Sequence, residues 1–148
     1  MSDYDLKRYV KEYETDYDTA LREIRNGRKE SHWMWYIFPQ LKGLGMSYMA
    51  EYFGMSGIDE AKAFLNDPYL GIRIKEISSA LLSLKTNDAL AVMDYPDNLK
   101  LKSSMTLFAL ASDSDTSNEN VFKQVLDKYF NGEYDNLTIE LLNRKEGR

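Results

Sequence analysis

Residues 27–45, GRKESHWMWYIFPQLKGLG, gather several residue types that can do chemistry. The segment contains the only histidine of the chain, His32, and both of its tryptophans. Histidine transfers protons near neutral pH, a lysine ammonium binds phosphate, and an aromatic ring stacks on a nucleobase. We therefore interpret His32 as a candidate catalytic residue, and we expect ligand contacts from Lys29, Trp35 and Gln40.

The same segment is also consistent with a hydrophobic core. In that interpretation the His32 ring bonds backbone groups, and four neighbours are buried: Trp33, Met34, Tyr36 and Ile37. Tryptophan and tyrosine are common in cores where their polar ends find partners. The density of aromatic residues with a polar end favours a site, because aliphatic side chains fill a core more simply. The sequence leaves both interpretations open.

Two glycines follow the aromatic residues in LKGLGMS. Gly43 and Gly45 would allow backbone amides to form a small anion-binding nest ahead of a helix that begins near Ser47. The spacing matches neither the dinucleotide fingerprint nor the P-loop, so a plain turn is the alternative. We include both glycines among the candidate ligand-binding residues.

A third group of polar residues lies in YPDNLKLKSSMTLF. On a helix, Asp97, Lys100 and Ser104 share one face. Asp97 would act as a base, Lys100 would stabilise developing charge, and Ser104 would contact a ligand. Alternatively, Asp97 caps the helix, Lys100 is solvated and Ser104 bonds a backbone carbonyl. The absence of a Gly-x-Ser-x-Gly motif argues against a hydrolase triad.

The elements that must position these residues are helices. Apolar residues recur at steps of three and four over residues 3–26, 68–85 and 121–130, which is the helical period. Asp67 followed by Pro68 predicts a capped helix start, and Thr86 is expected to cap a brief helix that ends at Met93. The quoted aromatic segment, if helical, begins near residues 29–31 and ends before Pro39. Leu101, Met105 and Phe108 mark a further helix, and residues 136–143 close the chain.

No alternation with a period of two extends over the length of a strand, and no internal repeat or long linker divides the chain. We therefore predict one all-α domain over residues 1–148, with about seven or eight irregularly packed helices. A chain of 148 residues is large enough to bury a single core.

Composition excludes several classes of function. With no cysteine and one histidine, the usual zinc sites are excluded, and no cofactor is indicated. The net charge of −5 argues against binding of bulk duplex DNA. No apolar stretch is long enough for a membrane span, and no signal core begins the chain, so we expect a cytoplasmic protein. The sequence does not indicate an oligomeric state.

Four segments resemble a known family: GRKESHWMWYIFPQLKGLGMS, EAKAFLNDPYLGIRIKE, KLKSSMTLF and VFKQVLDKYFNGEYDNLTIELL. It is the bacterial family of domains of unknown function numbered 1810, whose members are sometimes labelled calpastatin without basis. The resemblance covers nearly the whole chain and implies a compact, mainly α-helical domain. The chain differs from the family pattern at Glu12-Tyr13, where Ala-Gln is usual, and at Met93-Asp94, where Phe-Gly is usual.

The order of three segments is also similar to that in helical proteins associated with NAD and ADP-ribose: residues 32–40, 70–73 and 100–106. In N-glycosidases of that kind a catalytic acid is required, and here Glu30 or Asp97 would have to serve. Two functions follow. The first is a binder or hydrolase of a nucleotide or ADP-ribose-like small molecule, and the second is a non-catalytic module that binds a protein partner.

Overall fold

The computed structural model describes residues 4–112 and 120–145 and contains nine helices in them. They are α1 (Lys7–Arg25), α2 (Met34–Ile37), α3 (Tyr48–Tyr52), α4 (Ile58–Asn66), α5 (Leu70–Leu82), α6 (Ala89–Met93), α7 (Asp97–Ala111), α8 (Val121–Phe130) and α9 (Asn136–Lys145). Extended pairing in these residues is limited to one isolated bridge between Leu41 and Met55. The prediction of an all-α fold is confirmed. Nine helices exceed the expected seven or eight, and three of the nine have only four or five residues.

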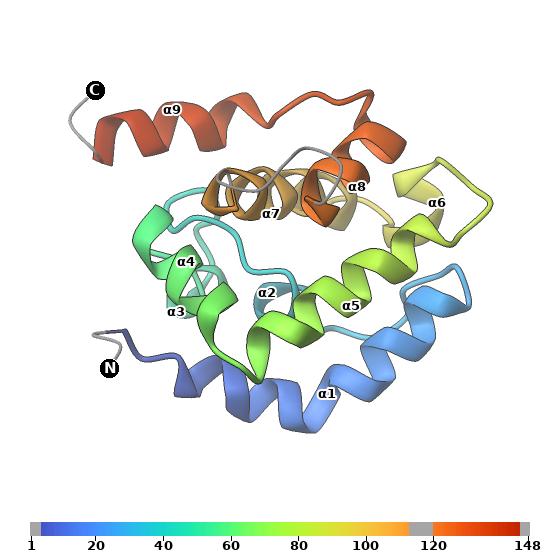
Figure 1. The fold of residues 1–148 in the computed structure, drawn as a ribbon, viewed down its shortest axis with the longest axis horizontal. Helices are drawn as coiled ribbons and strands as arrows, with labels where there is room; N and C mark the ends of the chain where they lie inside the picture. Colours follow the sequence, from blue (N-terminus) through green and yellow to red (C-terminus); the bar gives the residue numbers. More distant parts are fainter. Residues whose placement is uncertain (1–3, 113–119, 146–148) are drawn as a thin grey trace.

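Helix α1 lies along one side of the molecule (Figure 1). Three buried tyrosines on this helix pack into the core and donate hydrogen bonds to other segments of the chain. The hydroxyl of Tyr9 donates to the Phe53 carbonyl at 2.7 Å, and that of Tyr13 donates to the Ile37 carbonyl at 2.7 Å. Tyr17 donates to the Arg73 carbonyl at 2.8 Å. Each ring thus buries apolar area while its polar end is satisfied, as a core position requires of tyrosine.

Helix α7 is the central element of the fold (Figure 1). It contacts α4, α6, α8 and α9, and nearly all of its residues from Leu101 to Ala111 are buried. A helix that is covered on all sides needs no polar face, which explains why its apolar residues do not form a single stripe. Its first turn, around Asp97 and Lys100, is the part most open to solvent.

The helix boundaries follow local capping for the most part. Asp67 Oδ1 accepts hydrogen bonds from the backbone amides of Tyr69 and Leu70, as expected of a capping carboxylate, but α5 begins at Leu70 and not at Pro68 as predicted. The cap of α6 is Asp88, which accepts from Leu90 and Ala91, and the prediction for Thr86 is wrong. Thr86 Oγ1 instead accepts a hydrogen bond from the amide of Asp88.

The aromatic segment is much less helical than the sequence allows. Only Met34–Ile37 forms a helix, and residues 26–33 run in an irregular path from α1 to α2. None of the helices in residues 4–112 and 120–145 combines the length and the apolar character needed to cross a bilayer.

Candidate functional site

A cavity of about 350 Å³ separates the aromatic segment from the first turn of α7. One wall consists of Lys29, Glu30, His32, Met34 and Trp35, and the other of Met93, Asp94, Tyr95, Pro96, Asp97 and Lys100. This volume is at the lower end of the range of small-molecule sites. The structure therefore brings together five of the residues predicted from sequence: Lys29, His32, Trp35, Asp97 and Lys100.

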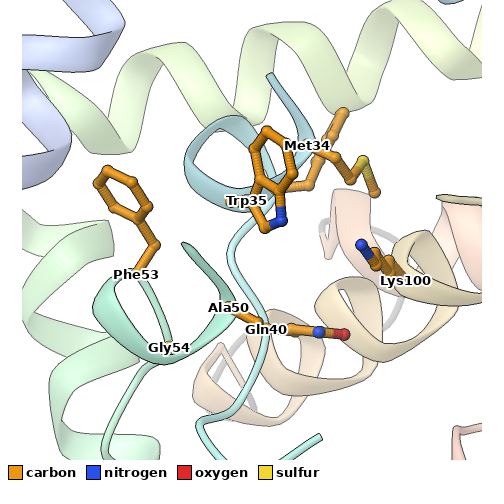
Figure 2. A pocket seen from close by; sticks show the side chains of 8 residues that line it. Met34, Trp35, Gln40, Ala50, Phe53, Gly54 and Lys100 are labelled. Atoms are coloured by element: carbon orange, nitrogen blue, oxygen red, sulfur yellow. The ribbon is translucent and has the colours of Figure 1, made fainter. Parts of the chain in front are cut away.

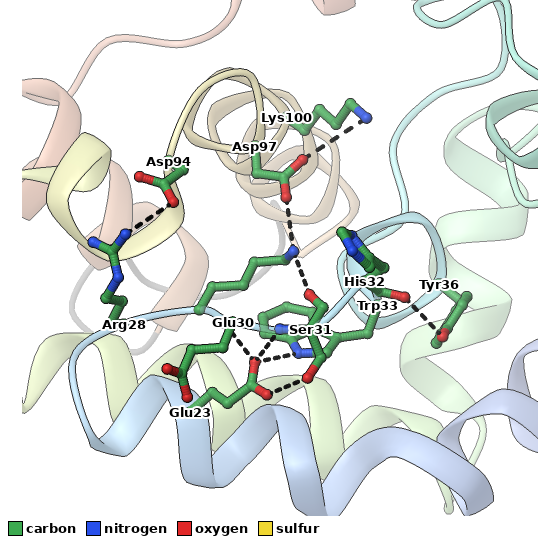
Figure 3. A network of polar contacts seen from close by, with 11 residues as sticks. Glu23, Arg28, Glu30, Ser31, His32, Trp33, Tyr36, Asp94, Asp97 and Lys100 are labelled. Carbon is green, nitrogen blue, oxygen red and sulfur yellow. Dashed lines mark hydrogen bonds and ion pairs between the residues drawn. The ribbon is translucent and has the colours of Figure 1, made fainter.

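An ion-pair network crosses the cavity floor (Figure 3). Asp97 Oδ2 lies 2.9 Å from Lys29 Nζ, and Asp97 Oδ1 lies 3.8 Å from Lys100 Nζ. The first contact joins the aromatic segment to α7, whereas the second lies within one turn of α7. Each carboxylate oxygen of Asp97 thus has an ammonium group nearby, and the closer one belongs to Lys29.

The two lysines have different surroundings. Lys29 is buried, and its ammonium also donates to the Ser31 carbonyl at 2.5 Å and lies 4.9 Å from the centre of the Trp33 ring. Lys100 is more exposed and lies 5.7 Å from the centre of the Trp35 ring. The Lys29 charge is therefore committed to protein partners, and Lys100 is the cation that can turn toward a ligand.

Three side chains predicted as site residues have polar groups that form no hydrogen bond with the described residues of the protein. His32 is exposed, and its ring has no hydrogen-bond or ion-pair partner among the residues that the structure describes. The indole nitrogen of Trp35 and the side-chain amide of Gln40 likewise have no partner within that part of the chain. Polar groups on a cavity wall without protein partners are free to bond a ligand or water.

Gln40 lies in a second, much smaller hollow that adjoins the cavity. This hollow has a volume of about 10 Å³, roughly enough for one water molecule, and shares Met34, Trp35 and Lys100 with the cavity. In Figure 2 the Trp35 indole nitrogen faces the space between Lys100 and Gln40. The Trp35 ring thus stands between the two spaces.

The aromatic segment is divided between core and cavity. Trp33, Met34, Tyr36 and Ile37 are all buried, as the core interpretation requires. His32 is exposed and Trp35 is half-buried, and both line the cavity, as the site interpretation requires. Each interpretation therefore describes part of the segment.

The remaining predicted ligand residues lie elsewhere. Ser104 is buried in α7 and lines neither the cavity nor the small hollow, and its hydroxyl has no hydrogen-bond partner among the described residues. Gly43 and Gly45 also lie outside both spaces. Gly43 adopts a φ of 105°, and a Cβ on Gly45 would lie 2.7 Å from the Ala50 Cβ, so a tight turn accounts for both residues. Ser47 accepts the amide of Ala50 and caps α3 itself.

Several cavity residues were not predicted from the sequence as ligand contacts. Met93, Tyr95 and Pro96 precede α7 and could have been found from their position beside Asp97. Asp94 has a φ of 63° and a ψ of 164°, a conformation that favours glycine, and its carboxylate lies 3.3 Å from Arg28. The resemblance to the family gives the signal here, because glycine is the usual residue at this position.

Glu23 is the other residue that sequence reasoning missed. It lies outside the cavity on α1, is buried, and accepts hydrogen bonds from residues 30, 31 and 33. Burial opposes ionisation, but the bonds from the Ser31 hydroxyl, the amides of Glu30 and Ser31 and the Trp33 indole outweigh it, and they lower the pKa of Glu23 to about 2. A helical wheel would have placed this residue at the edge of the buried face of α1, because it lies three residues after the buried Ala20.

Metal chemistry receives no support from the described side chains. Within residues 4–112 and 120–145, no group of three or more His, Asp or Glu residues is placed to hold a metal ion.

The fold and the cavity define a compact all-α protein with one basic and aromatic wall beside an acidic turn. The chain belongs to the family described as proteins of unknown function DUF1810, whose model matches residues 3–142. It is similar to the conserved hypothetical protein Rv1873 from Mycobacterium tuberculosis, with 40% sequence identity and a TM-score of 0.89. That match covers 95% of this chain and 98% of the other, whose crystal structure is known. No curated protein matches the chain.

Proposed function

We propose that this protein binds a small organic ligand in the cavity between the aromatic segment and α7. The observation that carries the proposal is that His32 and Lys100, which lie far apart in sequence, line one cavity. Together with Trp35 they offer an ionisable ring, a cation and an aromatic face, and none of the three is fully occupied by protein partners. This combination suits a ligand that has both a planar ring and an anionic group.

A nucleotide or an ADP-ribose-like molecule has these two features. Its phosphate would approach Lys100, and its base would lie against Trp35. Hydrolysis would in addition require a carboxylate that is free to act as an acid or base. Glu30 fits this role better than Asp97, because its exposed carboxylate has no partner within the described residues, whereas Asp97 is held by two lysines.

Calorimetric titration with ADP-ribose tests the proposal. We expect saturable binding to the parent protein and at least tenfold weaker binding to Lys100→Met. The matched control is Lys102→Met on the same helix, because Lys102 lies 3.5 Å from Glu133 and lines neither space. Equal affinities for the two variants, or no heat with ADP-ribose, AMP and NAD, would contradict the proposal.

His32→Gln provides a second arm of the same experiment. Because the ring is exposed and has no partner among the described residues, the free energy of unfolding should change by less than about 1 kcal/mol. The affinity for ADP-ribose should nevertheless fall. A variant that is strongly destabilised while the parent binds none of the nucleotides would indicate that His32 is structural.

The second candidate function, non-catalytic binding of a protein partner, has an observation of its own. Met46, Tyr48 and Tyr52 are exposed around α3, and the two tyrosine rings stack with their centres 5.9 Å apart. Exposed apolar side chains that lie close together are typical of protein-binding surfaces. Two results together would favour this function. The ligand titrations would show no binding, and Tyr48→Ser would change the elution volume of the protein in the presence of a partner but not in its absence.

A further inference from the structure

A single carboxylate on α1 accepts four hydrogen bonds from the second half of the irregular stretch of residues 26–33. Glu23 Oε1 accepts the backbone amides of Glu30 at 2.8 Å and Ser31 at 2.9 Å, and the Trp33 indole nitrogen at 2.9 Å. Glu23 Oε2 accepts the Ser31 hydroxyl at 2.5 Å. Figure 3 shows these donors converging on the Glu23 side chain. The stretch has no helix or strand of its own to satisfy these backbone groups.

The opposite side of the same stretch is tied to the elements across the cavity. The Lys29 amide donates to the Val92 carbonyl on α6 at 2.7 Å, and the Lys29 ammonium reaches Asp97 on α7. The stretch is thus held between α1 on one side and α6 and α7 on the other. Glu30 and His32 project from it into the cavity wall, and Trp35 follows within the first turn of α2.

We propose that Glu23 is a positioning residue for the ligand cavity, which fixes the backbone of residues 30–33 so that Glu30 and His32 face the space opposite α7. The proposal rests on the proposed function, because it assigns Glu23 a role in the same site. Glu23 itself does not line the cavity. Its effect reaches a ligand only through the residues that it holds.

The partners of Glu23 are what distinguish it from an ordinary buried acid. Among the described residues it forms no ion pair, so its charge is stabilised only by N–H and O–H donors of residues 30, 31 and 33, which carry the cavity residues Glu30 and His32. Glu60 provides the contrast. It is also buried, but it pairs with Arg8 at 3.1 Å and accepts the Ser56 amide at 2.8 Å, away from the cavity. Replacing the Glu23 carboxylate by a neutral group therefore changes the cavity wall, whereas the same replacement at Glu60 does not.

Nuclear magnetic resonance spectroscopy on Glu23→Gln and Glu60→Gln tests this assignment. The chain has one histidine and two tryptophans, so the His32 ring signals and the two indole N–H signals can be followed individually. In Glu23→Gln we expect shifts of the His32 and Trp33 signals and at least tenfold faster amide exchange of Glu30 and Ser31. Affinity for ADP-ribose should fall at least tenfold. Glu60→Gln should leave all of these unchanged.

Two results would overturn the proposal: unchanged His32 signals and amide exchange in Glu23→Gln, or equal changes in Glu60→Gln. If Glu23→Gln does not fold, Ser31→Ala removes only the bond to Oε2 and should produce the same changes with smaller amplitude. If the parent protein does not bind ADP-ribose, the proposed function fails for that ligand. The His32 ring signals and the amide exchange of Glu30 and Ser31 then still show whether Glu23 positions the residues of the cavity wall.

Discussion

Lys29 and Asp97 are joined by a contact of 2.9 Å between Nζ and Oδ2, which links the stretch before α2 to the first turn of α7. Both side chains are largely shielded from solvent, with 7% of Lys29 and 19% of Asp97 exposed. The pair therefore differs from a surface salt bridge, whose contribution to stability is small. It holds the two walls of the cavity at a fixed separation.

Replacement of Lys29 by methionine should lower the free energy of unfolding by about 3 kcal/mol, because Asp97 then loses its closest cation in a mostly buried place. Lys100→Met is the matched control and should cost less than about 1 kcal/mol, since that lysine is more exposed and lies farther from the carboxylate. Urea denaturation of both variants provides the measurement. Equal losses would mean that the two lysines share the same role.

Glu23 should make stability depend on pH in the acidic range. Its pKa of about 2 in the folded protein lies below the ordinary value of 4.5, so folding favours the ionised form. The stabilisation is fully present above 4.5 and is lost as the pH falls toward 2, with a total of about 3 kcal/mol. Urea unfolding across this range should therefore show a smaller difference between parent and Glu23→Gln at lower pH. A difference that does not change with pH would contradict the prediction.

Asp94 offers a substitution that should stabilise the protein. Its positive φ places a Cβ in a conformation that only glycine adopts without strain, so Asp94→Gly should raise the free energy of unfolding by about 1 kcal/mol. The lost ion pair with Arg28 is exposed and offsets little of this gain. Asp94→Ser removes the same carboxylate but keeps the Cβ, and it should show no gain in thermal denaturation. Similar melting temperatures for the two variants would argue against strain at this residue.

The cap of α5 gives a fourth prediction. Asp67→Ala removes the acceptor for the amides of Tyr69 and Leu70 and should cost about 1 kcal/mol in the free energy of unfolding. Asn66→Ala, at the exposed last residue of α4, is a suitable control and should change stability by less than half as much. An unchanged melting temperature for Asp67→Ala would show that the carboxylate does not cap the helix.

Most of the helices could be predicted because their signals are local. The spacing of Tyr9, Tyr13 and Tyr17 correctly predicts the buried face of α1. The Asp67-Pro68 pair predicts the start of α5 to within two residues. The aromatic segment could not be predicted in the same way. Its path depends on Glu23, a side chain of another helix that supplies acceptors which the segment itself lacks.

The candidate site was predictable in part for a similar reason. Helical spacing correctly placed Asp97 and Lys100 together, but it also placed Ser104 on their face without showing that this face of α7 is buried one turn later. Likewise, the sequence could not distinguish Lys29 from Lys100. Which lysine is covered depends on how α6 and α7 pack against residues 26–33.

We propose that a small ligand occupies the cavity beside His32, Trp35 and Lys100. Titration of the isotope-labelled protein with ADP-ribose, followed by NMR spectroscopy, tests it most directly, because the two indole N–H signals report on the two sides of one segment. Trp35 lines the cavity, whereas the Trp33 indole is bonded to Glu23 behind it. We predict saturable shifts of the Trp35 and His32 signals with little change at Trp33. Unchanged Trp35 and His32 signals at millimolar ADP-ribose, or shifts confined to the tyrosines of α3, would show that the ligand does not bind in this cavity.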